Sequence, residues 1–463
     1  LALIQTPHYF YSPDPFERNL SAGRTMPNEG ALFYGPVQQG NDNWNATFFC
    51  GSCAVIRRVA LEEVGGFAVE TVTEDAHSAL KMQRRGWNTA FLDIPLAAGL
   101  ATERLGLHVI QRTRWARGMT QIFRVDNPLL GRGLKWQQRL CYLNAMLHFQ
   151  FGLPRVVFLT APLAFLLFNL NIISSSASLI FAYALPHLVM SLYINSRMNG
   201  RFRYTFWGEI YETVMAFHLI LPTLVTMFAP KRGKFNVTDK GGLLDVGFFD
   251  FNIVKPHLIV AILMIIGIGY GIVRAIFHNY FAIDPNVIAL NIAWGSFSVL
   301  ILLAAIAVAK ETRQVRKTIR IDVAIPAIIH YANGISLRTT TIDMSMGGVQ
   351  LVTPDVRYLD EEIEEVEIQL SSGAESFPVT QISGDKERLR LQFENLPLSK
   401  RRELVRVVLC RADAWIGEEY PPDNPFRSLV SIIRCVFELF YNTWKERRAK
   451  NKPADATSKS EAA

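Results

Sequence analysis

The chain has 463 residues, half of them hydrophobic, with 30 phenylalanines and a formal net charge of +7. This length predicts two or three domains. The basic residues lie beside long apolar runs, as the positive-inside rule describes, so the charge does not indicate nucleic-acid binding. The five cysteines do not have the spacing of a disulfide framework. Cys50 and Cys53 form a single Cys-x-x-Cys motif without a second one, which argues against structural zinc.

The first hundred residues mix short strand-like runs with helical spacing, which predicts an α/β domain. We expect a buried strand within residues 1–7, strands at residues 54–56 and 89–92, and a helix over residues 75–85. Residues 104–150 alternate basic, aromatic and aliphatic side chains, which is typical of helices at a membrane interface. Because the chain opens on a buried strand, we expect it to begin inside a domain.

Four apolar runs are long enough to cross a bilayer, which needs about 20 residues. They cover roughly residues 152–172, 176–196, 255–277 and 286–309. A fifth run, over roughly residues 206–229, carries Glu209, Glu212 and His218.

Loop charge decides how the fifth run is interpreted. The stretches 197–203, 231–234 and 310–320 are all basic, and they share one face of the membrane only if the fifth run lies in the interface. We therefore predict four spans, an interfacial fifth segment and a cytoplasmic basic face. The alternative is a fifth span together with an unrecognised re-entrant segment.

Beyond residue 318 the pattern becomes that of a soluble β domain. Strand-like runs at 321–329, 348–352 and 389–393 alternate with turn signals at 333–334 and 372–373, which predicts a small antiparallel barrel. Residues 429–444 have amphipathic helical spacing. The small polar tail, residues 453–463, has the composition of a disordered segment.

A carboxylate stands just before the helix predicted to begin near residue 75. Asp75 follows Thr73 and Glu74 at a strand-to-helix junction, and loops at such places carry catalytic groups. A carboxylate there can accept a proton from an attacking hydroxyl. The alternative is helix capping, in which Thr73 or Asp75 binds free amides at the helix start.

A second candidate site follows along the chain. Gln111, Arg114 and Trp115 stand at i, i+3 and i+4, so on a helix they project from one face. Arginine suits phosphate oxygens, and tryptophan offers a broad apolar face for a sugar ring. The alternative is an interfacial helix whose Arg and Trp lie at the lipid headgroups.

Two further stretches have weaker patterns. In Phe48–Ser52, Cys50 can line a sugar site, or the segment is an ordinary buried strand. In the loop over residues 235–242, Thr238 and Lys240 can reach a diphosphate, or the loop is a solvated linker.

A last pair of motifs flanks the start of the predicted barrel. Arg316 and Arg320 can bind a guanine edge bidentately and stack on its plane. Asp343 can accept from guanine N–H groups. The alternatives are a basic patch beside the membrane and an ordinary turn, but the two motifs together are more specific than either alone.

These motifs occur in the order found in one known family. The chain resembles the catalytic subunit of bacterial cellulose synthase, a processive family 2 glycosyltransferase fused to a PilZ domain that binds cyclic di-GMP. The segments Gln5–His8 and Pro13–Phe16 also resemble that family, and the resemblance covers roughly residues 1–445.

The resemblance implies a multidomain membrane protein in the bacterial inner membrane. It would combine a partial α/β glycosyltransferase domain of the GT-A type with an interfacial helix (1–130) and a transmembrane channel region with a gating loop at 230–245 (131–311). A PilZ barrel (312–412) and an amphipathic helix with a disordered tail (413–463) would follow. The catalytic and PilZ domains would be cytoplasmic.

The resemblance also implies roles for single residues. Asp75 would be the general base, and Trp115 would stack on the acceptor glucose. Gln111 and Arg114 would hold the diphosphate region and acceptor end. The remaining implied contacts are Cys50, Thr73 and Glu74 near acceptor or donor, Phe235, Val237, Thr238 and Lys240 in the gating loop, and Arg316, Arg320, Asp343, Ser345 and Gly348 for cyclic di-GMP.

The implied partners are UDP-glucose, a growing β-1,4-glucan, cyclic di-GMP as activator, the bilayer and a periplasmic accessory subunit, but no nucleic acid. In the family, the Asp-x-Asp ligands of Mg²⁺ precede the segment that here begins at Gln5. We therefore expect no metal ligand in this chain and no turnover by the chain alone. Two alternatives remain, namely a synthase of another β-linked polymer and a membrane-tethered cyclic di-GMP receptor with an inactive transferase remnant.

Overall fold

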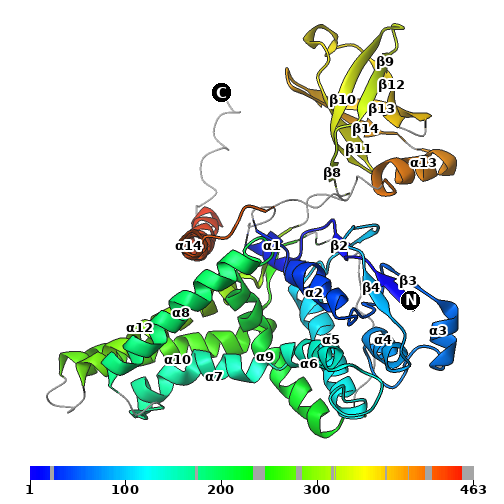
Figure 1. Cartoon of the computed structure of the whole chain (residues 1–463). Coiled ribbons are helices and arrows are strands. Elements are labelled where there is room, and N and C mark those ends of the chain that lie inside the picture. Colours follow the sequence, from blue (N-terminus) through cyan, green and yellow to red (C-terminus); the bar gives the residue numbers. More distant parts are fainter. Residues whose placement is uncertain are drawn as a thin grey trace, which may run out of the picture.

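The computed structural model describes residues 1–20, 26–172, 176–232, 244, 246–277, 284–313, 318, 320–370, 373–394, 396–411 and 420–450, the last part of the final helix by its backbone only. An α/β domain and a helical region pack together, and a β barrel lies beside the α/β domain (Figure 1).

A three-stranded sheet with β1 at its centre forms the middle of the α/β domain. β1 (Leu3–Gln5) pairs antiparallel with β3 (Ala54–Ile56) and parallel with β4 (Thr89–Phe91). These are the strands expected from the sequence. Leu3 is buried in a core with Phe48, Leu80 and Tyr142, so the apolar alternation of the first residues is explained by packing.

Short elements and two long helices complete this domain. The expected helix over residues 75–85 is confirmed as α4 (Glu74–Arg84), and the long helix after it is α5 (Leu105–Val125). The other elements are β2 (Tyr9–Phe10), α1 (Pro15–Asn19), η1 (Phe33–Val37), α2 (Gln38–Asn43), α3 (Arg58–Glu63), β5 (Ala98–Gly99) and α6 (Trp136–His148).

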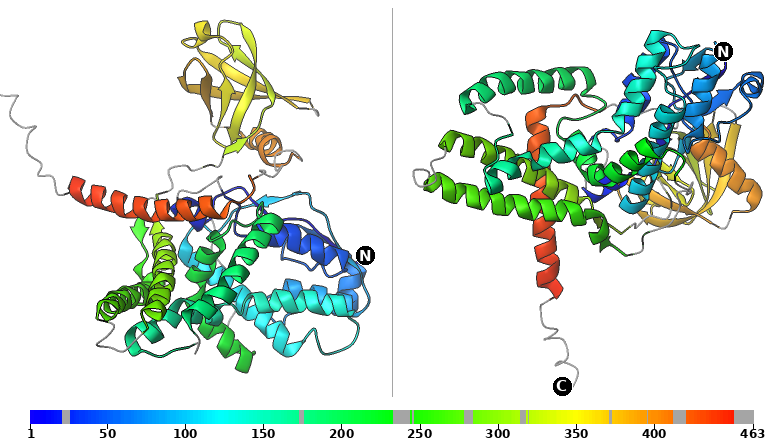
Figure 2. Two further views of the ribbon diagram at one scale, coloured as in Figure 1. Left: turned by 60° about the vertical axis from the view of Figure 1, so that its left-hand side comes forward. Right: turned by 90° about the horizontal axis from the view of Figure 1, so that it is seen from below.

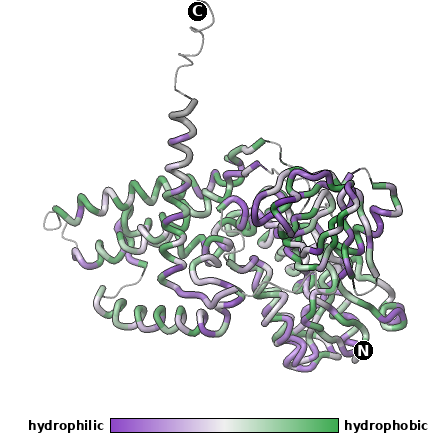
Figure 3. The backbone as a smooth tube through the Cα atoms, turned by 90° about the horizontal axis from the view of Figure 1, so that it is seen from above, coloured by the Kyte–Doolittle hydropathy of each residue, from purple (hydrophilic) through white to green (hydrophobic). Residues whose placement is uncertain are grey.

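The helical region contains the apolar runs. Its helices are α7 (Gly152–Phe168), α8 (Ala177–Asn199), α9 (Trp207–Phe228), α10 (Phe251–Ile276) and α12 (Pro285–Ala307). A two-stranded ribbon of β6 (Phe248–Phe249) and β7 (Lys310–Glu311) joins the start of α10 to the end of α12. The tube in Figure 3 shows long hydrophobic stretches along these helices.

Among the described residues, four single helices, α8, α9, α10 and α12, are long and apolar enough to cross a membrane. α7 meets the same test only together with α6, from which it is bent by 50°. The sequence instead assigned a span to residues 152–172 and an interfacial position to 206–229. α9 is long and apolar enough to cross a membrane, but half of its apolar window is buried by protein. The interfacial position of α9 therefore stays a prediction.

The β domain is a closed barrel, as the sequence predicted. Its strands follow the order β11-β14-β13-β12-β9-β10-β8, and pairing of β10 with β11 closes it. The strands are β8 (Arg320–Asp322), β9 (Pro326–Tyr331), β10 (Ser336–Ser345), β11 (Gly348–Val352), β12 (Ile363–Leu370), β13 (Gly373–Gly384) and β14 (Arg388–Phe393), with η2 (Val356–Tyr358) between β11 and β12.

One strand prediction in the barrel is wrong. The run over residues 321–329 was expected to be a single strand, but it breaks into β8 and β9. Pro326 stands at the first position of β9, where a missing backbone N–H costs least. Thr341 holds the break, because its hydroxyl accepts from the Ile325 N–H at 2.8 Å.

Two helices follow the barrel. α13 (Leu398–Leu409) packs on the barrel core through Leu404 and Val408. α14 (Pro425–Lys450) crosses the end of α12, where Ile432 joins the core shared by α5, α9 and α12 (Figure 2). The amphipathic pattern expected over residues 429–444 is therefore a real helix whose apolar side is partly buried.

Candidate active site and ligand-binding face

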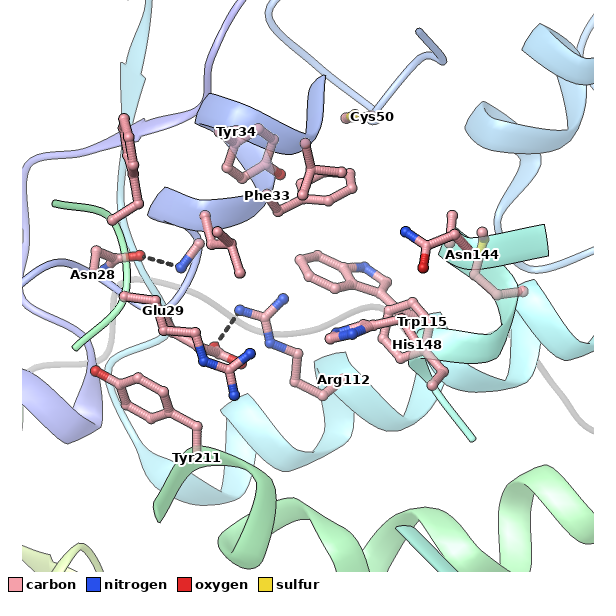
Figure 4. Close-up of a pocket in the computed structure, with 18 of the residues that line it drawn as sticks. Asn28, Glu29, Phe33, Tyr34, Cys50, Arg112, Trp115, Asn144, His148 and Tyr211 are labelled. Carbon is pink, nitrogen blue, oxygen red and sulfur yellow. Dashed lines mark hydrogen bonds and ion pairs between the residues drawn. The ribbon is translucent and has the colours of Figure 1, made fainter. Parts of the chain in front are cut away.

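A cavity of about 360 Å³ lies between the α/β domain and α9 (Figure 4). Its wall is largely aromatic and apolar, with a few polar groups. From the predicted site it includes Asp75, Thr73, Cys50 and Trp115. These four residues come from three segments far apart in the sequence, so only the fold brings them together.

Asp75 lies in the first turn of α4, at the edge of this cavity. Its Oδ1 accepts from the Ala76 N–H at 2.8 Å. Gly51 faces it so closely that an added Cβ there would stand 3.1 Å from Asp75 Oδ2. Burial raises the pKa of Asp75 to about 6, with the Ala76 N–H and the Arg114 charge acting in the opposite direction. A desolvated carboxyl with a pKa near neutrality is suited to proton transfer.

The capping alternative is wrong for Thr73. Thr73 is the N-cap residue of α4, but its side chain makes no capping hydrogen bond. Instead it presses on α5, where a Cβ added to Gly118 would lie 2.4 Å from the Thr73 hydroxyl oxygen. Thr73 therefore sets the approach of α4 to α5, and with it the distance between Asp75 and the residues of α5.

Gln111, Arg114 and Trp115 all lie on α5, as the sequence predicted. Of the three, Trp115 lines the cavity, and the described lining includes neither Gln111 nor Arg114. Arg114 nevertheless lies near enough to Asp75 for its charge to lower the pKa of that carboxyl. Glu74, next to Asp75, also stands outside the described lining.

Cys50 is held by its neighbours inside the cavity wall. Its backbone N–H donates to Gln5 Oε1 at 2.9 Å, and Gln5 Nε2 in turn donates to the Ser52 carbonyl at 2.9 Å. Burial raises the pKa of the Cys50 thiol, with the Asp75 charge adding to it. The thiol is therefore neutral and lines the cavity as a small apolar group.

Several residues of the cavity wall were not among the candidates that the sequence suggested. Glu29, Tyr34 and Arg112 line it, and Tyr34 contacts His8 at 2.9 Å between its hydroxyl and Nδ1. Arg112 carried a signal, since it stands three residues before Trp115 and so shares a helix face with it. Glu29 carried none, because its loop has no regular periodicity.

The barrel brings together four of the five residues expected to bind cyclic di-GMP. In β8 and β10, Ser345 pairs with Arg320, and the Arg320 guanidinium lies 3.3 Å from both carboxylate oxygens of Asp343. The Ser345 hydroxyl accepts from the backbone N–H groups of Gly347 and Gly348 at 3.2 and 3.1 Å.

Gly348 has a structural requirement of its own. A Cβ there would stand 2.3 Å from the Leu391 carbonyl oxygen on β14. Glycine is therefore required at this position because β14 passes so close to β11. The fifth residue, Arg316, and the gating-loop residues Phe235, Val237, Thr238 and Lys240 lie outside the described residues.

No group of three or more His, Cys, Asp or Glu side chains within the described ranges is arranged to hold a metal ion. The side chains that the structure describes therefore do not fit a Mg²⁺ site.

Comparison with known families agrees with this architecture. Residues 1–229 match "Glycosyl transferase family group 2", and residues 314–409 match "PilZ domain". A solved PilZ domain of CeSA from a cellulose-synthesizing bacterium covers 19% of this chain and 93% of its own, at 23% identity and a TM-score of 0.17.

Two relatives are similar over nearly the whole chain. A UDP-forming cellulose synthase catalytic subunit of Pseudomonas fluorescens is 53% identical over 93% of this chain and 58% of its own length. The cellulose synthase 1 catalytic subunit of Komagataeibacter xylinus is 49% identical over 98% of this chain and 62% of its own length. This chain thus spans about three fifths of both relatives. It belongs to the family of UDP-forming cellulose synthase catalytic subunits.

Proposed function

We propose that the protein transfers glucose from UDP-glucose to the non-reducing end of a growing β-1,4-glucan, as an inverting glycosyltransferase. One observation carries the proposal. Asp75, a partly buried carboxyl with a pKa of about 6, lines the same cavity as the indole of Trp115. A proton acceptor and a flat apolar surface in one cavity suit a sugar hydroxyl that must be both held and deprotonated.

Asp75 acts as the general base in this proposal. With a pKa of about 6, roughly nine tenths of the carboxyl is ionised at pH 7, yet its proton affinity exceeds that of an exposed aspartate. It takes the proton of the acceptor hydroxyl while that oxygen attacks the anomeric carbon of the donor. Arg114, whose charge lowers the pKa of Asp75 although its side chain is not among the described lining, is proposed to interact with the diphosphate of the departing UDP.

The acceptor end rests on the cavity wall. Trp115 stacks on the terminal glucose, and the small neutral side chain of Cys50 leaves room beside it. Gln111 is proposed to help hold the diphosphate region and the acceptor end, and Thr73 and Glu74, next to Asp75 at the start of α4, are proposed to contact acceptor or donor. The donor, UDP-glucose, would be held in part by the gating-loop residues, which lie outside the described residues.

The helical region conducts the product. The apolar helices α7, α8, α10 and α12 are proposed to cross the bacterial inner membrane and pass the glucan to a periplasmic accessory subunit. The catalytic and PilZ domains then face the cytoplasm. The support is the apolar character of these helices and the core that α7, α10 and α12 share with α5.

The barrel supplies regulation by cyclic di-GMP. Arg320 already lies beside Asp343 and Ser345, so a guanine edge and a phosphate would meet an arginine, a carboxylate and a hydroxyl on one surface. Arg316 is proposed to complete this set. Binding there is proposed to free the gating loop and raise the rate of transfer.

The test compares the whole protein encoded by the gene of this chain with the same protein carrying Asp75→Asn. UDP release and cellulase-digestible polymer are measured with UDP-glucose, Mg²⁺ and cyclic di-GMP. The proposal expects both to vanish in the variant while cyclic di-GMP binding is retained. Unchanged polymer output would favour a cyclic di-GMP receptor, and a polymer resistant to cellulase would favour another β-linked product.

A further inference from the structure

The indole of Trp115 is covered on one of its two faces by a cation. The guanidinium carbon of Arg112 lies 4.3 Å from the centroid of the Trp115 ring. A planar guanidinium at this distance is a stacking partner as well as a charge. A sugar that stacks on Trp115 must therefore use the opposite face, and the orientation of the indole depends on where Arg112 is held.

Arg112 is held by a carboxylate from a distant loop. Its Nη2 forms an ion pair with Glu29 Oε2, and both side chains are about four-fifths buried. Figure 4 shows this pair between the loop and α5. Glu29 lies far from α5 in the sequence. It can therefore act on Trp115 only through contacts made in the folded protein.

A histidine of α5 contacts the same carboxylate oxygen and lies beside Arg112, with 3.4 Å between His108 Nε2 and Arg112 Nε. His108, one turn before Arg112 on α5, places its Nε2 at 3.2 Å from Glu29 Oε2. His108 is itself buried, with its Nδ1 at 3.1 Å from the Thr102 hydroxyl and its ring edge-on to Phe16. Glu29 therefore has little freedom to move.

Glu29 remains ionised beside Arg112 and His108. Burial alone would raise the pKa of Glu29, but the Arg112 guanidinium and His108 outweigh it and hold the pKa well below its usual range. Glu29 stays ionised, and the buried Arg112 stays paired. Removal of the carboxylate charge would leave a largely buried cation without its counter-ion, which favours movement of Arg112 away from the indole.

We propose that Glu29 is a positioning residue for the acceptor platform: it holds Arg112 against one face of Trp115 and thereby fixes the indole for a β-linked glucan. This inference rests on the proposed function for the identity of the ligand. Glu29 acts through Arg112 and takes no part in proton transfer, so it sets acceptor affinity rather than the rate of the chemical step.

The other end of α5 offers a matched control. Asp126 forms an ion pair with Arg84 at 2.8 Å and lies 3.4 Å from His77 Nε2, and His77 Nδ1 lies 3.2 Å from the Thr71 hydroxyl. This group repeats the carboxylate, arginine, histidine and threonine of the Glu29 group. None of its four members lines the described cavity.

The experiment is a double-mutant cycle in the full chain, with Glu29→Gln, Arg112→Met and the two combined. Two quantities are measured: the affinity for cellohexaose and, without ligand, the Trp115 contribution to fluorescence and near-ultraviolet circular dichroism, obtained by subtraction of a Trp115→Phe variant. In the active protein, the acceptor KM and kcat are separated.

We expect Glu29→Gln to weaken cellohexaose binding roughly fivefold, a loss typical of one cation–π contact, to raise the acceptor KM with little change in kcat, and to alter the Trp115 spectrum. In the Arg112→Met background the same change should have no further effect. Asp126→Asn should leave binding and the Trp115 spectrum unchanged. If Glu29→Gln fails to fold, Arg112→Lys, which keeps the ion pair but not the planar group, should still alter the Trp115 spectrum.

The proposal is overturned if Glu29→Gln, or in its place Arg112→Lys, leaves the Trp115 spectrum unchanged. It is equally overturned if the effect of Glu29→Gln has the same size with and without Arg112. Failure of the proposed function is distinct: the wild-type chain would then not bind cellohexaose, while the ligand-free spectrum would still decide whether Glu29 positions Trp115.

Discussion

Replacement of Asp75 by asparagine should remove activity and raise stability at the same time. The side chains have the same shape, and an asparagine Oδ1 can still accept from the Ala76 N–H. What changes is the charge. Loss of a general base typically lowers the rate about 10²- to 10⁴-fold, so UDP release should fall by that factor.

The stability gain follows from the buried charge. A pKa raised from 3.8 to about 6 by burial means that the folded state disfavours the ionised carboxylate by about 3 kcal/mol, at about 1.36 kcal/mol per pKa step. Because the pKa of Asp75 is higher in the folded than in the unfolded state, the wild-type protein is destabilised by this amount as the pH rises from about 4 to about 6. Above pH 6 the full penalty applies. The Asp75→Asn variant carries no such penalty at any pH.

Thermal unfolding in detergent at pH 5 and pH 8 measures the difference. The variant should unfold at a higher temperature than the wild type, by up to a few degrees, and the gap should be larger at pH 8. A gap that is the same at both pH values would show that the carboxyl is not desolvated. A variant that is less stable at pH 8, or that retains full UDP release, would refute the role assigned to Asp75.

Three other changes test the packing around the site and the regulatory parts. Gly118→Ala should clash with Thr73, costing about 1–3 kcal/mol in the unfolding free energy and lowering UDP release; wild-type values for both would contradict the close approach of α4 and α5. Arg320→Ala should weaken cyclic di-GMP binding at least about tenfold in calorimetry, whereas Arg357→Ala, an exposed arginine of the same barrel paired with its own neighbour, should not. Asp423→Ala should free α14, because the Asp423 carboxylate accepts from the Thr205 N–H and the Ser428 hydroxyl at 2.9 and 2.7 Å; limited proteolysis should then cut before α14, and an unchanged pattern would contradict this.

Much of the secondary structure could be read from the chain because burial leaves a local pattern. The strands β1, β3 and β4, the helix α4 and the barrel strands β11 and β14 stand where their apolar periodicity predicted them. The failure at residues 321–329 has a local cause too, since Pro326 interrupts a run whose apolar residues otherwise continue.

The members of the site were less predictable than its elements. Helical spacing grouped Gln111 and Arg114 with Trp115, but Arg112 shares a face with Trp115 equally well. Which side of α5 meets the cavity depends on the packing of Met215 and Leu219 of α9 against Ala116. That choice is tertiary, and it placed Arg112 on the cavity wall.

Local patterns in the sequence were enough to predict an α/β domain, apolar helices able to cross a membrane and a β barrel, and to suggest Asp75 and Trp115 as candidate site residues. These conclusions depend on apolar periodicity and motif order, which are local properties. The contacts of Gly51 with Asp75, of Glu29 with Arg112, and of Asp423 with Thr205 and Ser428 became visible only in the folded structure. Contacts between distant segments arise from the joint packing of many side chains, and no local pattern encodes them.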